Sequence, residues 1–238
     1  MNHTPLFSIV SVCYNCQDKV IKTIHSLKEQ DFSDYEYLVI DGASTDRTLE
    51  RVREATTDME RVVVISEKDS GIYDAMNKGV KAASGKYLFF LNMGDTFFDS
   101  HVLSSFAKAM GDEKDIYHGN VCRSDGKEID QKGKASLRWA IYREYMISHQ
   151  SLFAKRSLLL AEPFHTMYHV CADREWLIRV LKKGVSVEHL PVTVCNFETD
   201  GISSEYEMFE KESMAISCHY GGPLTRWWLI IKRCFRKR

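Results

Sequence analysis

The first 91 residues alternate between strand-like and helix-like segments, and this alternation restricts the fold more than any other feature of the sequence. Short runs of apolar and β-branched residues have the character of buried strands. They cover residues 7–12, 35–40, 62–65 and 87–91. Segments with apolar residues at helical spacing lie between them, at 19–30, after Asp46 and at 72–83. Because each strand–helix–strand connection crosses one face of the sheet with a preferred hand, this order predicts a Rossmann-like α/β fold, with a mostly parallel sheet flanked by helices.

The second half of the chain predicts a further α/β unit with C-terminal helices, in a less regular order. The expected elements are a helix at 102–110, a strand at 116–122, a hairpin and loop at 123–136, a strand at 150–154, a helix at 174–183, a strand at 185–197 and a helix at 203–219. We expect one domain over residues 1–222, with halves at 1–98 and 99–222, followed by a tail at 223–238 that mixes aromatic and basic residues.

The composition is that of an ordinary globular protein. Of 238 residues, 44% are hydrophobic and 27% are charged, which is enough for a sizeable core. The 32 Lys and Arg residues balance 33 Asp and Glu residues, so the net charge of -1 supplies no overall attraction to nucleic acid. No apolar run approaches the roughly 20 residues of a membrane-spanning helix. Residues 1–5 lack a signal-peptide pattern, and we therefore expect a cytoplasmic protein.

The cysteines indicate reduced thiols rather than a disulfide framework, because there are seven of them, an odd number, scattered along the chain. Cys13 and Cys16 form a single C-x-x-C pair. A zinc site would need a second pair of ligands, so we interpret this pair as packing at the end of a strand.

Polar and aromatic residues follow the predicted strands at the point where each strand ends. They are Tyr14, Asn15, Asp41, Glu67, Asp69, Asn92 and Asp95. Ligands of open parallel sheets bind at this edge, where an aromatic ring can stack on a nucleobase and carboxylates can hold a divalent cation. Asp and Asn also favour turns, so any one of these residues alone could be structural. The G-x-G-x-x-G and P-loop motifs are missing, so a bound diphosphate would need a cation and basic side chains.

Four motifs at these strand ends occur in a characteristic order: Tyr14-Asn15, Asp41-Gly-Ala-Ser-Thr-Asp46, Asp69-x-Gly-Ile-Tyr-Asp-Ala-Met-Asn-Lys-Gly79 and Leu91-Asn-Met-Gly-Asp95. Together they resemble family 2 glycosyltransferases of the GT-A fold. The resemblance continues more weakly at Ser148-His-Gln-Ser151, Ala172-Asp-Arg-Glu-Trp176 and Asp200-Gly-Ile-Ser203, which are similar to segments of bacterial capsule and exopolysaccharide transferases.

The resemblance implies a binding site for a nucleotide-sugar donor, with uridine as the common base. Tyr14 would stack on the base with Asn15 beside it, and Asp41 would accept a hydrogen bond from the ring N–H. Asp69 would close the nucleoside pocket. Asn77 would lie in the segment that leads to the metal-binding strand.

Asp95 occupies the last position of the family's aspartate-rich metal motif, where a carboxylate holds Mg²⁺ or Mn²⁺ against the donor phosphates. Hard divalent cations prefer such oxygen ligands. The family usually has acidic residues at the positions of Asn92 and Gly94, so this chain departs from the pattern. The departure leaves an alternative open, a nucleotide-sugar-binding protein with weak or no catalytic activity.

Asp173 matches the family's catalytic aspartate, which precedes a helix that carries Trp176. It would remove the proton from the acceptor hydroxyl as that oxygen attacks the anomeric carbon, with inversion of configuration. A role as the N-cap of the helix is the alternative. We interpret His149 as a core or rim residue and leave it out of the catalytic set.

The predicted function is therefore the transfer of a single sugar from a nucleotide diphosphate sugar, expected to be UDP-linked, to a hydroxyl of a bacterial surface polysaccharide or lipid-linked glycan. Arg226-Trp227 lacks the Gln of the Q-x-x-R-W segment in processive synthases, which favours one sugar per binding event. The tail at 223–238 could lie on anionic lipid at the inner face of the plasma membrane, or it could be a docked helix with a solvated basic end. A sugar-phosphate nucleotidyltransferase is disfavoured because residues 11–18 contain no glycine.

Overall fold

A computed structural model describes residues 3–123, 125–142, 147–197, 206–222 and 225. The segment 200–203 lies outside these ranges, as does the predicted tail at 223–238 apart from Thr225. Within the described ranges, none of the helices combines the length and the apolar character needed to cross a membrane.

The first half of the chain forms the alternating strands and helices that the sequence predicts. They are β1 (Phe7–Cys13), α1 (Gln17–Lys28), β2 (Tyr35–Asp41), α2 (Thr48–Thr56), β3 (Val62–Ser66), α3 (Ile72–Ala82) and β4 (Tyr87–Phe90). Every residue of β1 is buried. Ile9 packs into the core on one face of the sheet and Val10 into the core on the other, as the two-residue period of a strand covered on both faces requires.

The second half contains the predicted elements together with a 3₁₀ turn and three short helices or strands that the sequence pattern did not indicate. In chain order, all its elements are β5 (Thr96–Phe97), α4 (Val102–Ala109), β6 (Ile116–Arg123), β7 (Glu128–Ile129), α5 (Leu137–Tyr142), the 3₁₀ turn η1 (His149–Ser151), β8 (Leu152–Lys155), α6 (Arg156–Ala161), α7 (Ala172–Lys182), β9 (Val187–Phe197) and α8 (Tyr206–Gly221). The unpredicted elements β5, α5 and α6 have only 2, 6 and 6 residues, too few to show a clear period.

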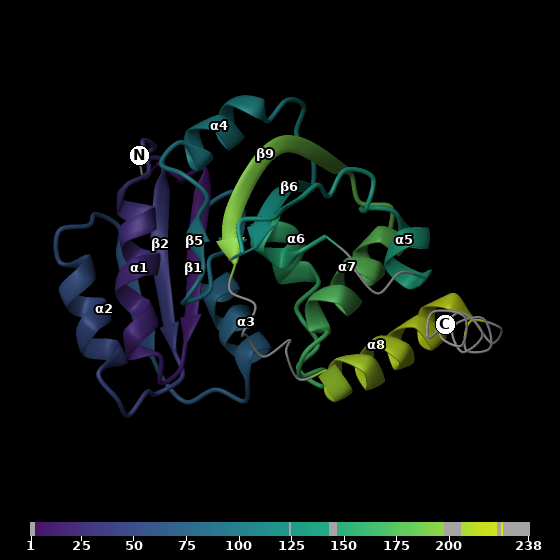
Figure 1. Ribbon diagram of the computed structural model, residues 1–238, viewed down its shortest axis with the longest axis horizontal. Coiled ribbons are helices and arrows are strands. Elements are labelled where there is room, and N and C mark those ends of the chain that lie inside the picture. Colours follow the sequence, from purple (N-terminus) through teal and green to yellow (C-terminus); the bar gives the residue numbers. More distant parts are fainter. Residues whose placement is uncertain (1–2, 124, 143–146, 198–205, 223–224, 226–238) are drawn as a thin grey trace.

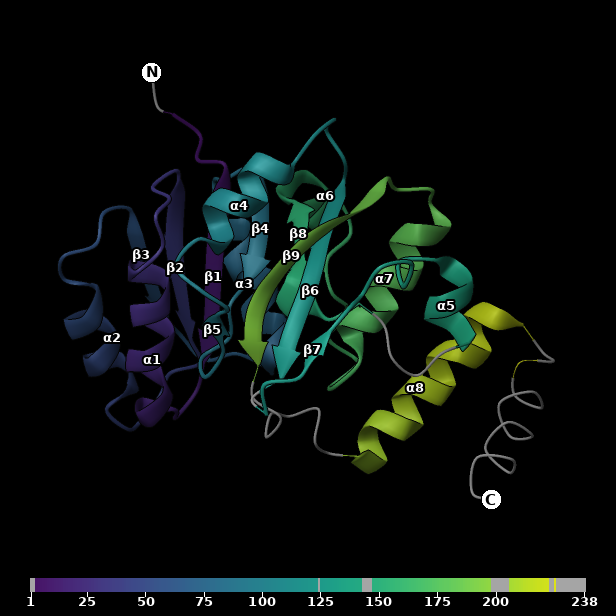
Figure 2. The ribbon, with the colours of Figure 1, turned by 45° about the horizontal axis from the view of Figure 1, so that its top comes forward.

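The strands join into one nine-stranded sheet in the order β3-β2-β1-β4-β8-β6-β9-β5, with β7 paired to β6 (Figure 2). The first four strands are parallel, as expected. The second half is mixed: β6 and β9 are parallel, whereas β8 runs antiparallel to both β4 and β6, and β5 runs antiparallel to β9.

Helices cover both faces of the sheet and complete the α/β architecture (Figures 1 and 2). Buried residues of α1, α2 and α4 pack on one face, and those of α3, α6 and α7 pack on the other. Helix α8 packs against α5 and α7, at the end of the molecule away from α2. The guanidinium of Arg174 in α7 ties α8 down, since it donates to Ser213 O at 2.9 Å and to Ser217 Oγ at 2.8 Å.

Candidate active site

Three of the residues predicted to bind a nucleotide meet beyond the carboxyl ends of β1 and β2. Cys13 pairs in register with Asp41, so Tyr14 and Gly42 leave the sheet side by side. A Cβ atom at Gly42 would lie 2.6 Å from Oδ2 of Asp69 and 3.4 Å from Cδ2 of Tyr14. The absence of a side chain at Gly42 therefore lets Asp69 approach. The Tyr14 ring is 63% exposed, which leaves a face on which a planar ligand can stack.

Asp41 and Asn15 hold the loops after β1 and β2 together. Oδ2 of Asp41, which is fully buried, accepts hydrogen bonds from Ser44 N at 3.1 Å and from Ser66 Oγ at 2.6 Å. Asn15 is exposed; its N–H donates to Ser44 Oγ at 2.8 Å and its Oδ1 accepts from Thr45 N at 2.9 Å. Asp41 is therefore buried where the loops meet, and Asn15 joins the two loops at the surface.

Asn77, also expected near the nucleotide, makes its two side-chain hydrogen bonds with the backbone of Phe164. Its Nδ2 donates to the carbonyl of Phe164 at 2.9 Å, and its Oδ1 accepts from Phe164 N at 3.0 Å. Both ends of the amide are therefore used to hold the loop between α6 and α7 against α3. In this structure the Asn77 amide therefore connects two segments of the protein, and its expected place beside the nucleotide stays a prediction.

Asp173 lies in the first turn of α7 rather than at its N-cap, which is Cys171. A carboxylate from α8 holds the loop before this turn: Glu212 accepts from His169 N at 2.7 Å and from Cys171 N at 2.9 Å. An acidic side chain suits the positive end of a helix dipole. This clamp fixes the backbone that presents Asp173.

Side chains from two other segments contact the Asp173 carboxylate. His149 Nδ1, from η1, lies 2.9 Å from Oδ2, and the Tyr73 hydroxyl, from α3, donates to Oδ1 at 3.1 Å. The Arg174 N–H also donates to Oδ1, at 2.7 Å. The side chains of His149 and Asp173 are 26% and 28% exposed, so they are mostly shielded but reachable from solvent.

The electrostatic environment keeps Asp173 ionised. Burial by itself raises the pKa of Asp173. The hydrogen bond from His149 and the charge that this ring carries when protonated lower the pKa by a larger amount, so it is below the usual value. Burial by itself lowers the pKa of His149, yet Asp173 and, more weakly, the charge of Asp95 raise it above the usual value. Asp95 and Asp173 are therefore both close enough to His149 to raise its pKa.

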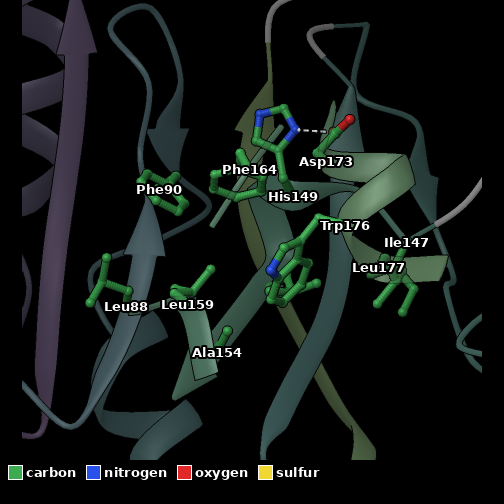
Figure 3. A pocket seen from close by; sticks show the side chains of 11 residues that line it. Leu88, Phe90, Ile147, His149, Ala154, Leu159, Phe164, Asp173, Trp176 and Leu177 are labelled. Carbon is green, nitrogen blue, oxygen red and sulfur yellow. Dashed lines mark hydrogen bonds and ion pairs between the residues drawn. The ribbon is translucent and has the colours of Figure 1, made fainter. Parts of the chain in front are cut away.

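A small apolar cavity of about 20 Å³ lies beneath the His149–Asp173 pair (Figure 3). Figure 3 shows the pair at one end of the cavity and apolar side chains such as Phe90, Leu159 and Trp176 around the rest of it. Its volume holds about one water molecule, too little for a sugar. The cavity thus excludes bulk water from below the pair, and a ligand must approach from the other side.

His149 also connects this pair to the predicted metal motif. Its Nε2 lies 3.1 Å from Nδ2 of Asn92, at the start of Asn92-Met-Gly-Asp95. The backbone of the motif is held by Thr23 of α1, whose Oγ1 accepts from Gly94 N at 2.9 Å and donates to Asp95 O at 2.8 Å. Gly94 has φ 112°, a conformation that glycine adopts and that side chains disfavour.

The metal motif offers few ligands, and they suit Mg²⁺ or Mn²⁺. No group of three or more His, Cys, Asp or Glu residues within the described ranges could hold a metal ion. The Asp95 carboxylate is 5% exposed, and Oδ1 of Asn92 is buried without a hydrogen-bond partner among the described residues. Magnesium is commonly held by one or two carboxylates together with substrate phosphates rather than by a protein cage. The residues present fit such a shared site.

The sequence analysis missed two residues of this site, His149 and Tyr73. His149 lies in the Ser148-His-Gln-Ser151 segment and Tyr73 in the Asp69-to-Gly79 motif, so both were inside quoted motifs. Their contacts to Asp173 span 24 and 100 residues, and periodicity carries no signal over such separations. The only sequence signal for these two residues was that they lie in segments similar to those of the family.

Comparison with known proteins gives the same family and fold. The family described as "Glycosyl transferase family 2" matches residues 8–172. A PGL/p-HBAD biosynthesis glycosyltransferase of Mycobacterium bovis (strain BCG / Pasteur 1173P2) is 29% identical over 206 residues, which cover 84% of this chain and 80% of the relative. Chondroitin synthase of Escherichia coli is 28% identical over 193 residues, which cover 77% of this chain and 28% of that protein.

Solved structures share the fold at lower identity. Staphylococcus aureus (S. aureus) TarS 1-349 in complex with UDP superimposes with a TM-score of 0.70 and 20% identity, covering 89% of this chain and 64% of the TarS chain. This chain thus spans less than two thirds of that structure. Glucosyl-3-phosphoglycerate synthase from Mycobacterium tuberculosis, in complex with Mn²⁺, UDP and glucosyl-3-phosphoglycerate, superimposes with a TM-score of 0.66 and 18% identity, covering 92% of this chain and 81% of that chain. Both show the GT-A fold. Because the family pattern covers more than half of its residues, the chain belongs to glycosyl transferase family 2.

Proposed function

We propose that the chain is an inverting glycosyltransferase that moves a single sugar from a UDP-linked donor to a hydroxyl of a surface polysaccharide or lipid-linked glycan. One observation carries the proposal: His149 lies within hydrogen-bond distance of both Asp173 and Asn92, so the predicted base and the predicted metal motif belong to one site. We divide the work between a donor half, residues 1–98, and an acceptor half, residues 99–222.

The donor half would hold the nucleotide. The exposed Tyr14 ring would stack on the base, and Asp69 would approach the nucleoside over Gly42. Ser44 and Ser66 already donate hydrogen bonds to the Asp41 carboxylate, and one of them would have to be displaced for the nucleobase to bind there. We therefore assign the main contact with the nucleobase to Tyr14. The occurrence of UDP in the TarS and glucosyl-3-phosphoglycerate synthase structures supports a uridine donor.

Asp95, with Oδ1 of Asn92, would hold Mn²⁺ or Mg²⁺ together with the donor diphosphate. The cation, when bound, stabilises the negative charge that develops on the leaving nucleotide. The Mn²⁺ in the glucosyl-3-phosphoglycerate synthase complex, and in a complex of the mannosyltransferase PcManGT from Pyrobaculum calidifontis with GDP-Man, supports a divalent cofactor.

Asp173 would act as the general base. Its lowered pKa keeps it ionised at neutral pH, and its partial exposure lets an acceptor hydroxyl reach it. The carboxylate takes the hydroxyl proton while the oxygen forms a bond to the anomeric carbon, and the bond from that carbon to the diphosphate breaks. Attack from the face opposite the leaving group inverts the configuration and requires no covalent enzyme intermediate.

Titration with UDP in the presence and absence of Mn²⁺, followed by measurement of UDP release from UDP-sugars with glycan acceptors, tests the proposal. We expect UDP binding that Mn²⁺ strengthens, and acceptor-dependent UDP release. An Asp173→Asn variant should bind UDP as the wild type does and lose on the order of 10²–10⁴-fold in turnover.

A second candidate function is nucleotide-sugar binding without catalysis, which the missing charges at Asn92 and Gly94 favour. In that case UDP binds but neither the wild type nor the variant releases UDP from any donor. Turnover that is equal in the wild type and in Asp173→Asn would exclude Asp173 as the base.

A further inference from the structure

We propose that His149 is a positioning residue, which holds the Asp173 carboxylate through Nδ1–H and is itself held at Nε2 by the amide of Asn92. The inference rests on the proposed function, since it explains how the base of that reaction is oriented. It also extends that function, because it makes Asn92 of the donor-side motif a determinant of the base on the acceptor side.

The direction of the hydrogen bonds follows from the chemistry of the groups. An Asn side-chain nitrogen carries two protons and has no lone pair to offer, so Nδ2 of Asn92 donates and Nε2 of His149 accepts, at 3.1 Å. A neutral imidazole with an accepting Nε2 carries its proton on Nδ1. That proton points at Oδ2 of Asp173, which lies 2.9 Å from Nδ1. Asn92 thus selects the tautomer that can hold the base.

These contacts also identify the oxygen that receives the proton. A carboxylate offers about four lone-pair sites, two on each oxygen. Oδ1 of Asp173 accepts from the Arg174 N–H at 2.7 Å and faces the Tyr73 hydroxyl at 3.1 Å, so protein donors occupy the surroundings of both of its sites. Oδ2 accepts from His149, which fills one. Among the described residues, the second site on Oδ2 has no donor, so the acceptor hydroxyl would bind there.

The arrangement ties the two halves of the site together. Asn92 comes directly after β4 and Leu91, Asp173 comes from α7, and the ring of His149 bridges them across 57 and 24 residues of sequence. The other amide atom of Asn92, Oδ1, is buried and has no partner among the described residues. The amide of Asn92 therefore contacts His149 through its nitrogen, while its oxygen stays available for another ligand.

A positioning role predicts a specific pattern of kinetic effects. Loss of the ring leaves Asp173 free to rotate, and misplacement of a catalytic group by about 1 Å costs on the order of 10²-fold in rate. His149→Ala should lower kcat by about 10²-fold, while KM for the donor and the affinity for UDP stay close to wild type. His149→Asn keeps an amide donor near the position of Nδ1 and should retain kcat within about tenfold of wild type, whereas His149→Gln reaches the Nε2 position and should resemble His149→Ala.

His101 supplies the matched control. Its Nδ1 lies 2.7 Å from Oδ2 of Asp31, so it forms the same kind of pair on an exposed surface. His101→Ala should leave kcat and KM unchanged. If His149→Asn is as slow as His149→Ala although both are folded, or if His149→Ala raises the donor KM without lowering kcat, the positioning role is wrong.

Nitrogen NMR of the nucleotide-free wild type tests the inference independently of turnover. Long-range ¹H–¹⁵N spectra assign the ring of His149 by comparison with His149→Asn. At a pH above the raised pKa of His149, where the ring is neutral, we expect the proton on Nδ1 and a bare Nε2; a neutral ring with its proton on Nε2 would overturn the inference. If the chain shows no transfer with any donor but carries the Nδ1–H tautomer, the proposed function fails while the tautomer assignment stands. If the chain transfers a sugar but His149 carries its proton on Nε2, the tautomer assignment is wrong while the proposed function stands.

Discussion

The hydroxyl of Tyr73 lies 3.1 Å from Oδ1 of Asp173, and this contact joins α3 of the donor half to α7 of the acceptor half. The same hydroxyl lies 2.8 Å from the carbonyl of Val170. A phenol has one proton for these two acceptors. Burial and the charge of Asp173 raise the pKa of Tyr73 well above its usual value, so the hydroxyl keeps that proton and remains a donor.

Removal of this hydroxyl should affect both stability and turnover. Tyr73→Phe keeps the buried ring but leaves Val170 O and Asp173 Oδ1 without a donor from this side, which should lower the free energy of unfolding by about 1–2 kcal/mol. We expect turnover to fall severalfold with unchanged affinity for UDP, because the lost hydroxyl contacts the proposed base Asp173. Urea unfolding and UDP-release assays check both effects. If the wild type and Tyr73→Phe have equal stability and equal turnover, this contact contributes to neither property.

The exposed ring of Tyr14 should contribute to binding and not to stability. Tyr14→Ala removes a side chain that is 63% exposed, so the free energy of unfolding should change by less than about 0.5 kcal/mol. Base stacking on an aromatic ring contributes about 1–3 kcal/mol, so the affinity for UDP should fall by a corresponding factor. Tyr14→Phe, which keeps the ring, is the control and should bind normally. Calorimetric titration measures the three affinities; equal affinities would place the base elsewhere.

Asp95 should determine the response to metal. Asp95→Asn keeps the size of a buried side chain and removes its charge, so UDP should still bind but Mn²⁺ should no longer strengthen its binding. Removal of divalent cations with EDTA should reduce the wild type to the level of the variant. Asp112→Asn, in the exposed loop before β6, is the control and should respond to Mn²⁺ as the wild type does. A full Mn²⁺ response in Asp95→Asn would exclude this carboxylate as a ligand.

A buried histidine outside the active site should make stability depend on pH. Burial and the neighbouring ring of His189 lower the pKa of His118 to about 4, from an ordinary value of 6.5. Between these values the unfolded chain binds more protons than the folded protein, so the contribution of His118 is fully present above pH 6.5 and is lost as the pH falls towards 4. The full difference amounts to roughly 3 kcal/mol.

Thermal unfolding of His118→Leu across this range checks the sign. The difference in stability between wild type and variant should shift in favour of the variant as the pH falls, because leucine binds no proton. His101 offers a contrast: its hydrogen bond to Asp31 raises its pKa, so its contribution is present at low pH and is lost as the pH rises. If the wild type and His118→Leu have parallel pH profiles, His118 does not titrate differently in the two states.

Much of the fold was predictable because the information is local. A strand such as β1 or a helix such as α3 can be recognised within a window of 7 to 11 residues, because its apolar side chains recur at a period of 2 or 3.6 residues. The order of these elements then restricts the topology, so the parallel arrangement of β1 to β4 and the meeting of Tyr14 with Asp69 follow from the chain itself. The family likeness rests on the same local motifs.

Other features depended on which distant segments pack together. Antiparallel β8 enters between β4 and β6, and nothing in its four residues specifies either neighbour. The contacts of His149 with Asp173 and Asn92, and the contact of Asn77 with Phe164, join side chains that are 24 to 87 residues apart. The sequence alone therefore determined the elements and the residue types at the sheet edge, whereas the tertiary structure decided which of those side chains hold one another. Hydrogen bonds need atoms within about 3 Å, and packing across the whole sheet sets such distances.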